Sequence, residues 1–373
     1  MNKPFLIEIQ PNNLGDTIFL GPSLQELSKF YDIIFVGNKV FKSFFENWSF
    51  VKHFIWVELL NDSSWWQIIQ NPYNCNKAAA IKEEIKKLIG YTNRAFMRSV
   101  FTPPTSIKNV ENYYGIPFLN IQKFNSKHNK CSLTVKQLTR ILRNEQKIEE
   151  IHDEVKFVPT FFIEPSANKK QIVLCDGSWN DRCRSLHYSM LNLLCEHLAK
   201  KYTNEGYEIV CLYDISRDPF INKLPNVNYI CTNGDYEASV KIKNIFEAGI
   251  SLFIVPDSGL AYVALSCNIP VIWIESRIRA EWRIPPYYAI QKIATMWRRK
   301  TWNCQMNCDA ASYIKRHGIE QKIYPEEAPG LEVKEFYKFL RCKEEPIIPC
   351  MNFSQQDIEE LDTVIQTKLN VCC

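Results

Sequence analysis

The sequence predicts an α/β protein with two domains, each built on a parallel β-sheet. The chain of 373 residues is longer than most single domains. Hydrophobic residues make up 46% and charged residues 23%, values typical of a chain that forms packed cores. Short apolar runs alternate with segments of helical periodicity in two separate blocks, a pattern that places helices on both faces of a parallel sheet.

The first block opens with an apolar run at 5–9, which predicts a strand. Leu20, Leu24 and Leu27 then recur at helical spacing, and a second apolar run ends at Gly37 and Asn38. Pro103 and Pro104 indicate a loop. The expected elements are strands at 5–9 and 32–36 and helices at 15–30, 77–89 and 134–151. The order of strands between about 48 and 156 does not follow from the sequence.

The second block has the regular strand and helix alternation of a nucleotide-binding domain. Its expected strands are 171–175, 207–212, 227–231, 251–255 and 270–274, with helices at 188–201, 240–247 and 260–266. A last helix is expected at 355–368, and the connection between the domains at 159–170. We therefore expect domains at 1–165 and 166–350, followed by a C-terminal helix and tail at 351–373.

Charge and hydropathy exclude several classes of protein. With 45 basic and 41 acidic residues the net charge is +4, so electrostatics gives no argument for a nucleic-acid partner. The longest apolar runs, such as 252–255 and 269–274, are far below the roughly 20 residues of a membrane span. The apolar run at 4–7 is interrupted by Glu8 and is shorter than the apolar core of a secretory signal, so we expect none there. We expect a cytoplasmic protein.

The 14 cysteines are unusually many. Five of them lie within apolar runs, and in a reducing compartment we interpret these as small buried hydrophobic residues. They are Cys175, Cys195, Cys211, Cys231 and Cys267.

The first candidate for chemistry is Gly15 followed by Asp16, between a strand and a helix. Glycine allows a tight turn, and the carboxyl edge of an open α/β sheet is where such folds bind ligands. A carboxylate there can accept a proton from a hydroxyl group. Taken alone, the motif fits a helix N-cap better.

The second candidate is Asp257, Ser258 and Gly259, again between a strand and a helix. The free N–H groups of a helix start can hold a diphosphate, and the positive helix end stabilises its charge. A capped turn without a ligand explains the same residues equally well.

The third candidate is the loop 176–184, in which Arg182 or Arg184 can bind phosphate through two hydrogen bonds. A solvated basic loop is an equal alternative. His187 fits best as a residue at the entry of the following helix.

A late group of cysteines follows a segment rich in Arg, Lys, Trp and Tyr at 277–302. Four thiolates can form a tetrahedral zinc or iron site, and reduced free cysteines are the alternative. The cysteines are Cys304, Cys308, Cys342 and Cys350. The basic and aromatic segment fits peripheral contact with the inner face of a membrane or an acidic glycolipid, and equally a solvated loop.

The order of these motifs resembles glycosyltransferase family 9, the heptosyltransferases of bacterial surface polysaccharides. Gly15 and Asp16, with Pro22 six residues on, resemble the family's opening. Residues 184–187 fall where the family has Lys-x-Trp-Pro, and residues 257–262 resemble its Asp-Ser/Thr-Gly-x-x-His segment. Residues 349–351 and the helix after them resemble the end of the cysteine-bearing members.

The resemblance implies the GT-B fold, two Rossmann-like domains facing a cleft. It implies inverting transfer of a heptose-like sugar, without a required cofactor, from a nucleotide diphosphate to a hydroxyl of a polysaccharide or glycolipid such as lipopolysaccharide. The implied general base is Asp16. The residues implied to contact the donor are Gly15, Arg182, Arg184, Asp218, Asp257, Ser258, Gly259 and Tyr262, with Asp214 the alternative to Asp218.

Three residues depart from the family pattern. Tyr262 stands in place of histidine, Arg184 in place of lysine and Leu186 in place of tryptophan. They leave the donor open between ADP-heptose and another nucleotide sugar. Two other functions stay open: a protein O-glycosyltransferase that assembles through a tail with cysteine-bound metal, and a non-catalytic nucleotide-sugar-binding protein.

Overall fold

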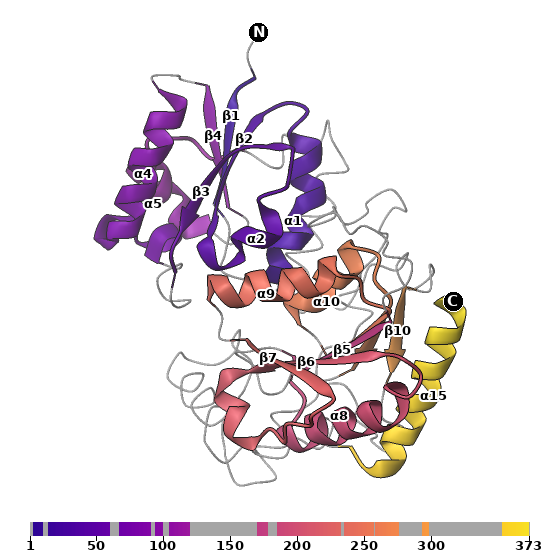
Figure 1. Cartoon of the computed structure of the whole chain (residues 1–373). Helices are drawn as coiled ribbons and strands as arrows, with labels where there is room; N and C mark the ends of the chain where they lie inside the picture. Colours follow the sequence, from indigo (N-terminus) through magenta and orange to yellow (C-terminus); the bar gives the residue numbers. More distant parts are fainter. Residues whose placement is uncertain are drawn as a thin grey trace. The chain divides into compact units, whose positions relative to one another are not determined.

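A computed structural model describes most of both blocks (Figure 1). The described residues are 3–9, 14–59, 67–90, 94–99, 104–119, 170–177, 185–232, 235–256, 258–275, 293–297 and 353–372. The chain divides into two compact units, Met1–Phe162 with Gly234–Lys243 and Ile163–Asn233 with Asn244–Cys373. Every strand pair in both sheets is parallel, so the predicted α/β class is confirmed.

The sheet of the first unit has the strand order β3-β2-β1-β4. Its strands are β1 (Phe5–Ile9), β2 (Asp32–Asn38), β3 (Val51–Val57) and β4 (Ala95–Arg98). The chain leaves β1 toward β2 and β3 on one side and returns on the other side as β4. The order of the sheet therefore reverses between β1 and β4.

Helices cover both faces of this sheet (Figure 1). They are α1 (Leu14–Leu27), α2 (Lys42–Phe45), α4 (Asn76–Ile89) and α5 (Pro104–Tyr114), with short 3-10 turns η1 (Lys39–Phe41) and η2 (Pro72–Asn74). Ile7 and Ile9 of β1 share a buried cluster with Ile81 and Ile85 of α4. Because side chains alternate along a strand, Glu8 points to the opposite face.

The sheet of the second unit has the order β10-β9-β8-β5-β6-β7. Its strands are β5 (Gln171–Cys175), β6 (Glu208–Asp214), β7 (Val227–Thr232), β8 (Leu252–Pro256), β9 (Val271–Ile274) and β10 (Ala294–Trp297). The order reverses between β5 and β8, which pair directly.

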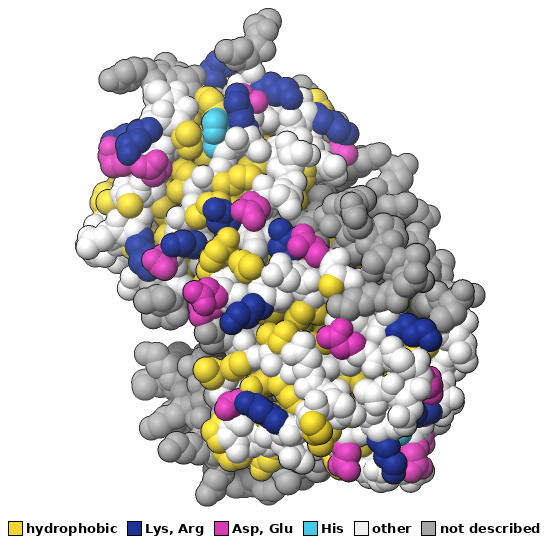
Figure 2. Space-filling model, in the orientation of Figure 1, with side chains coloured by type: hydrophobic (Ala, Val, Ile, Leu, Met, Phe, Trp, Pro, Cys, Tyr) yellow, Lys and Arg dark blue, Asp and Glu magenta, His cyan; other side chains and the backbone are white. Residues whose placement is uncertain are grey.

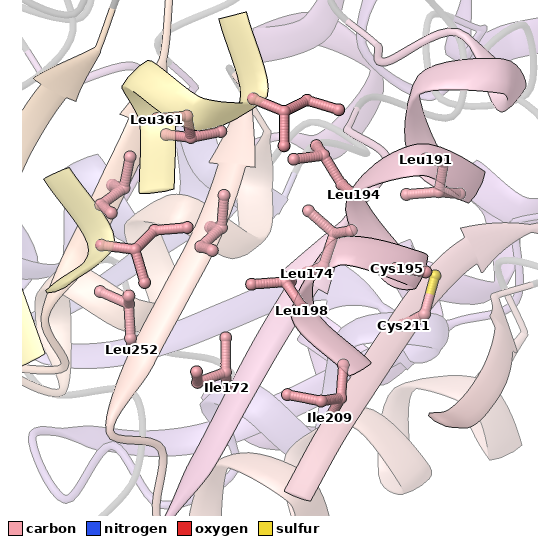
Figure 3. Close-up of a cluster of buried hydrophobic side chains, with 14 of the residues drawn as sticks. Ile172, Leu174, Leu191, Leu194, Cys195, Leu198, Ile209, Cys211, Leu252 and Leu361 are labelled. Atoms are coloured by element: carbon pink, nitrogen blue, oxygen red, sulfur yellow. The ribbon is translucent and has the colours of Figure 1, made fainter. Parts of the chain in front are cut away.

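One face of the second sheet packs against α8 (Tyr188–Tyr202) and α15 (Gln355–Cys372), and the other against α10 (Gly259–Ser266) (Figure 1). In α9 (Tyr236–Glu247) the residues up to Lys243 belong to the first unit, and Phe246 near its end packs against Phe253 of β8. A 3-10 turn, η4 (Ile215–Phe220), follows β6. Figure 3 shows Leu194 and Leu198 of α8 and Leu361 of α15 converging on Ile172 and Leu252 of the sheet. The helix α15 thus completes this apolar core.

Most predicted elements are observed within a few residues of their expected bounds. The strands β3, β4 and β10 and the helix α5 were not predicted. The expected loop at Pro104 is wrong, because Pro104 is the first residue of α5, where its missing N–H costs no hydrogen bond. The helix expected at 134–151 and the connection expected at 159–170 lie outside the described residues, apart from Lys170.

The described cysteines are free thiols. Cys175, Cys195 and Cys211 are buried as expected, whereas Cys231 and Cys267 are only partly buried. Among the helices of the described segments, none combines the length and apolarity that crossing a membrane requires. On the face drawn in Figure 2, the described Lys and Arg side chains alternate with Asp and Glu.

Candidate functional site

The second sheet brings three candidate segments to one edge. Its strands are parallel, so the ends of β8, β5 and β6, which are neighbours in the sheet, lie side by side. The connections that follow β5 and β8 leave in opposite directions, and open α/β sheets bind ligands at such a reversal of strand order. Three of the candidate segments therefore begin at adjacent strand ends.

The first segment joins β8 to α10. Ser258 is the N-cap of α10, and its hydroxyl accepts a hydrogen bond from the Leu260 N–H at 3.3 Å. Gly259 is the first residue of the helix, where N–H groups have no partner within the helix. The N-cap interpretation is confirmed, and it leaves the helix start able to hold an anion. Asp257 lies outside the described residues.

The second segment begins at Asp176, directly after β5. One carboxylate oxygen of this buried residue accepts a hydrogen bond from the Asp214 N–H at 2.9 Å, which joins the ends of β5 and β6. Its carbonyl oxygen accepts from the Leu186 N–H at 2.7 Å. The sequence did not single out Asp176; the available signal was an acidic residue directly after a wholly apolar strand.

The loop after Asp176 is closed at its base. Gly177, with φ of 118°, forms an isolated antiparallel bridge with Ser185. Residues 178–184 between them lie outside the described residues, including Arg182 and Arg184. The bridge holds the Ser185 backbone beside Gly177 at the end of β5. Arg184 is the residue directly before Ser185 in the sequence.

The third segment follows β6 and contains Asp218, an exposed residue. Its Oδ1 atom accepts hydrogen bonds from the Tyr213 hydroxyl at 2.5 Å and the Lys223 ammonium at 2.8 Å. The bond from Lys223, followed by that from Tyr213, lowers the pKa of Asp218. The carboxylate is therefore charged, and Tyr213 and Lys223 hold it in one orientation through its Oδ1 atom. Ile215 and Phe220, both exposed apolar residues, belong to the same turn.

Two of the three residues that depart from the family pattern, Leu186 and Tyr262, are described, and both are buried in packing contacts, as is the neighbouring His187. Leu186 is fully buried in the core of the second unit. His187 is the N-cap of α8 and accepts a hydrogen bond from the Ser189 N–H through Nδ1. Tyr262 is 3% exposed, and its ring packs edge-on against Trp273 with centroids 5.5 Å apart. The tyrosine ring therefore forms part of the packing between α10 and β9.

In the first unit, Gly15 and Asp16 are the second and third residues of α1, which follows the end of β1. This end lies beside β4, at the reversal of strand order in the first sheet. Gly15 is buried. The side chain of Asp16 is not described, so its role as a base stays a prediction.

The four late cysteines and most of the basic and aromatic segment at 277–302 lie outside the described residues. Within the segments that are described, no group of three His, Cys, Asp or Glu residues is arranged to hold a metal ion. The predicted metal site at Cys304, Cys308, Cys342 and Cys350 is therefore not tested by the structure.

Comparison with known proteins defines the fold. No protein-family model and no curated protein sequence matches the chain. Among solved structures, it is similar to a family 9 glycosyltransferase from Veillonella parvula, with a TM-score of 0.55, 12% identity and coverage of 99% of this chain and 98% of that one. It is also similar to the E. coli ADP-heptose LPS heptosyltransferase II, with a TM-score of 0.51, 14% identity and coverage of 80% and 91%.

A third structure, the E. coli heptosyltransferase WaaC with ADP, gives a TM-score of 0.50 at 11% identity, with coverage of 84% and 98%. At these identities the likeness establishes the fold, two Rossmann-like units of the GT-B glycosyltransferase class. Within that class, all three structures are heptosyltransferases or members of glycosyltransferase family 9. The resemblance expected from the motifs is thus confirmed at the level of the fold.

Proposed function

We propose that this chain is a glycosyltransferase that moves a sugar from a nucleoside diphosphate to an acceptor hydroxyl. The observation that carries the proposal is the edge of the second sheet, where a capped helix start, the base of an arginine-bearing loop and an oriented carboxylate follow three neighbouring strands. These are the groups that a nucleotide diphosphate requires: N–H donors and guanidinium for phosphate, and an acceptor for ribose hydroxyls.

In this proposal the donor lies along that edge. The start of α10, with Asp257, Ser258 and Gly259, holds the diphosphate together with Arg182 and Arg184. Asp218 accepts hydrogen bonds from the ribose through the oxygen that Tyr213 and Lys223 do not engage, and Tyr262 supports α10. One of the similar structures contains ADP and another is named for ADP-heptose. We propose ADP-heptose as the first donor to test.

The proposed chemistry is a direct displacement with inversion. The acceptor oxygen forms a bond to the anomeric carbon while the bond from that carbon to the diphosphate breaks. Asp16 takes the proton of the acceptor hydroxyl. The departing diphosphate keeps the electron pair, and the helix start and arginines stabilise its charge. The proposed acceptor is a sugar hydroxyl of a surface polysaccharide or glycolipid, which segment 277–302 would approach at a membrane surface.

The test has two stages. ADP, UDP, GDP and their sugar conjugates are screened for a rise in melting temperature, because a ligand at 100 times its Kd stabilises the folded state by about 2.7 kcal/mol. Transfer is then measured for the wild type, for Asp16→Asn and for Asp32→Asn, a control aspartate paired with Lys52 on the surface of the same unit.

We expect Asp16→Asn to lower kcat by roughly 10²- to 10⁴-fold with donor affinity unchanged, and Asp32→Asn to keep the wild-type rate. A wild-type rate for Asp16→Asn would remove the proposed base. The absence of any stabilising nucleotide would remove the proposed donor site.

One observation favours the second candidate, a non-catalytic nucleotide-sugar-binding protein. Tyr262 has replaced the family's histidine and is packed against Trp273. Stabilisation by nucleotide sugars without transfer to any acceptor would select this function. The protein glycosyltransferase alternative predicts zinc or iron in the purified protein, an oligomer by sizing, and loss of both when Cys304 and Cys308 are replaced by serine.

A further inference from the structure

A buried ion pair joins strands β1 and β4 on one face of the first sheet. Glu8 of β1 and Arg98 of β4 are partners in the strand register, and their side chains are 0% and 3% exposed. The Arg98 Nε atom lies 3.1 Å from Glu8 Oε2. Both side chains lie on the face opposite Ile7 and Ile9, away from the apolar cluster that includes α4.

The same guanidinium group also contacts α1. Arg98 Nη1 donates a hydrogen bond to the Ser23 hydroxyl at 3.0 Å, and Ser23 is buried in α1. One side chain therefore joins β1, β4 and α1. Only arginine presents several donors in a rigid fork, so a lysine at this position could not make both contacts with the same geometry.

A pair of this kind is costly to keep for stability alone. The cost of removing two charges from water offsets much or all of the energy gained from their attraction. Replacing a buried ion pair by well-packed apolar residues of similar volume therefore often leaves the stability of a protein unchanged or raises it. The best-attested benefit of buried polar groups is that they fix one arrangement of the elements they join. Apolar packing tolerates a helix that slides along a sheet, whereas a hydrogen bond to one hydroxyl does not.

The contact fixes the position of α1 on the first sheet, and α1 carries Asp16, the proposed base. The pair lies where the strand order of the first sheet reverses, and α1 begins directly after β1. Ser23 follows Asp16 by seven residues, about two helical turns, and so belongs to the same row along the helix.

We propose that Arg98, held by Glu8, is a positioning residue that sets α1 on the first sheet through Ser23 and thereby places Asp16 for proton transfer. This inference rests on the proposed function. A direct contact of Arg98 with substrate is a poorer explanation, because the Arg98 side chain is only 3% exposed.

Three variants test the proposal. Ser23→Ala removes the contact on α1 and leaves the ion pair intact, and Ser23→Thr restores the hydroxyl. The double variant Glu8→Leu with Arg98→Met replaces the pair by apolar residues of similar length. Ser28→Ala is the matched control, because its exposed hydroxyl donates to the Gln25 carbonyl at the end of α1, away from the ion pair.

We expect Ser23→Ala and the double variant to lower kcat at least tenfold, with the donor KM within twofold of wild type. Ser23→Thr returns kcat to within threefold, and Ser28→Ala leaves it unchanged. The double variant keeps or raises the melting temperature, so its loss of activity cannot be a loss of folding. Wild-type kcat in both Ser23→Ala and the double variant would overturn the proposal.

Hydrogen exchange separates this proposal from the proposed function. If the wild type transfers no sugar, the glycosyltransferase assignment fails, but the setting of α1 is still measured without substrate. We expect amides in the second half of α1 to exchange at least tenfold faster in the double variant, although its melting temperature is no lower. Unchanged exchange along α1 would show that the pair positions nothing.

Discussion

Replacing Asp362 by asparagine tests how α15 is held on the second sheet. The Asp362 carboxylate accepts a hydrogen bond from the Tyr202 hydroxyl at 2.7 Å and lies 2.9 Å from His197 Nε2. It is also paired with Lys201, and Gln366 of its own helix donates to it at 2.6 Å. Three of these four partners belong to α8, so this carboxylate links the two helices on one face of the sheet.

The magnitude follows from the pKa of the carboxyl group. Burial by itself raises that pKa, but hydrogen bonds from Lys201, His197, Tyr202 and Gln366 outweigh it and lower the pKa of Asp362 from 3.8 to about 2. This difference corresponds to about 2 kcal/mol of stability. Because the folded-state pKa is the lower one, the contribution is fully present above pH 4 and is lost as the pH falls toward 2.

We expect Asp362→Asn to lower the free energy of unfolding of the second unit by about 2 kcal/mol at pH 5, and its melting temperature by about 4–8 °C. Urea denaturation followed by circular dichroism measures the first quantity. Glu359→Gln, an exposed change on α15, is the control and should alter stability by less than about 0.5 kcal/mol.

The pH dependence gives the sharper comparison. At pH 3 the difference between wild type and Asp362→Asn should shrink by about 1 kcal/mol, because the wild-type carboxylate is then losing its advantage over the unfolded state. A difference that stays constant between pH 5 and pH 3 would refute the assignment of this stability to the charged carboxylate.

Three further predictions concern the first unit and the proposed donor site. Gly37→Ala places a Cβ atom 2.5 Å from Phe35 Cε1 and 2.9 Å from Trp56 Cζ3, so we expect a loss of about 1–3 kcal/mol in the stability of the first unit, measured by thermal unfolding. Ser258→Ala removes the cap of α10 and should cost about 1 kcal/mol together with weaker ADP binding by calorimetry, while Ser258→Thr retains both. Asp218→Asn should weaken nucleoside diphosphate binding about tenfold, a loss of about 1.4 kcal/mol, without lowering the melting temperature of the free protein; unchanged ADP affinity would exclude Asp218 from the site.

The elements that could be predicted from the sequence are those whose pattern is local. Strands β1 and β5 are nearly continuous apolar runs, because both faces of a central parallel strand are covered. The edge strand β3 was missed, since Lys52 and His53 interrupt its apolar pattern where one side is exposed. Strand β4 was missed because it has only four residues and ends in the charged but buried Arg98.

In the candidate site, too, features with a local sequence signal could be predicted, and contacts between distant segments could not. The helix start at Ser258 follows from a capping residue between a strand and a helix, which is a local signal. The contacts of Asp176 with the Asp214 N–H and of Arg98 with Glu8 depend on the register between strands far apart in the sequence. A charged residue inside an apolar run shows that a partner is required, but only the sheet identifies it.

The docking of α15 has a consequence for how the second unit is made. Its strands up to β9 precede α15 in the chain by a long interval, yet Ile358, Leu361, Ile365 and Leu369 of α15 complete one face of their sheet. During synthesis α8 can cover only its part of that apolar face, and the part that α15 covers stays exposed to aggregation and to chaperones until α15 leaves the ribosome. A ribosome stalled before residue 355 should therefore carry a first unit able to fold and a second unit that still binds chaperones.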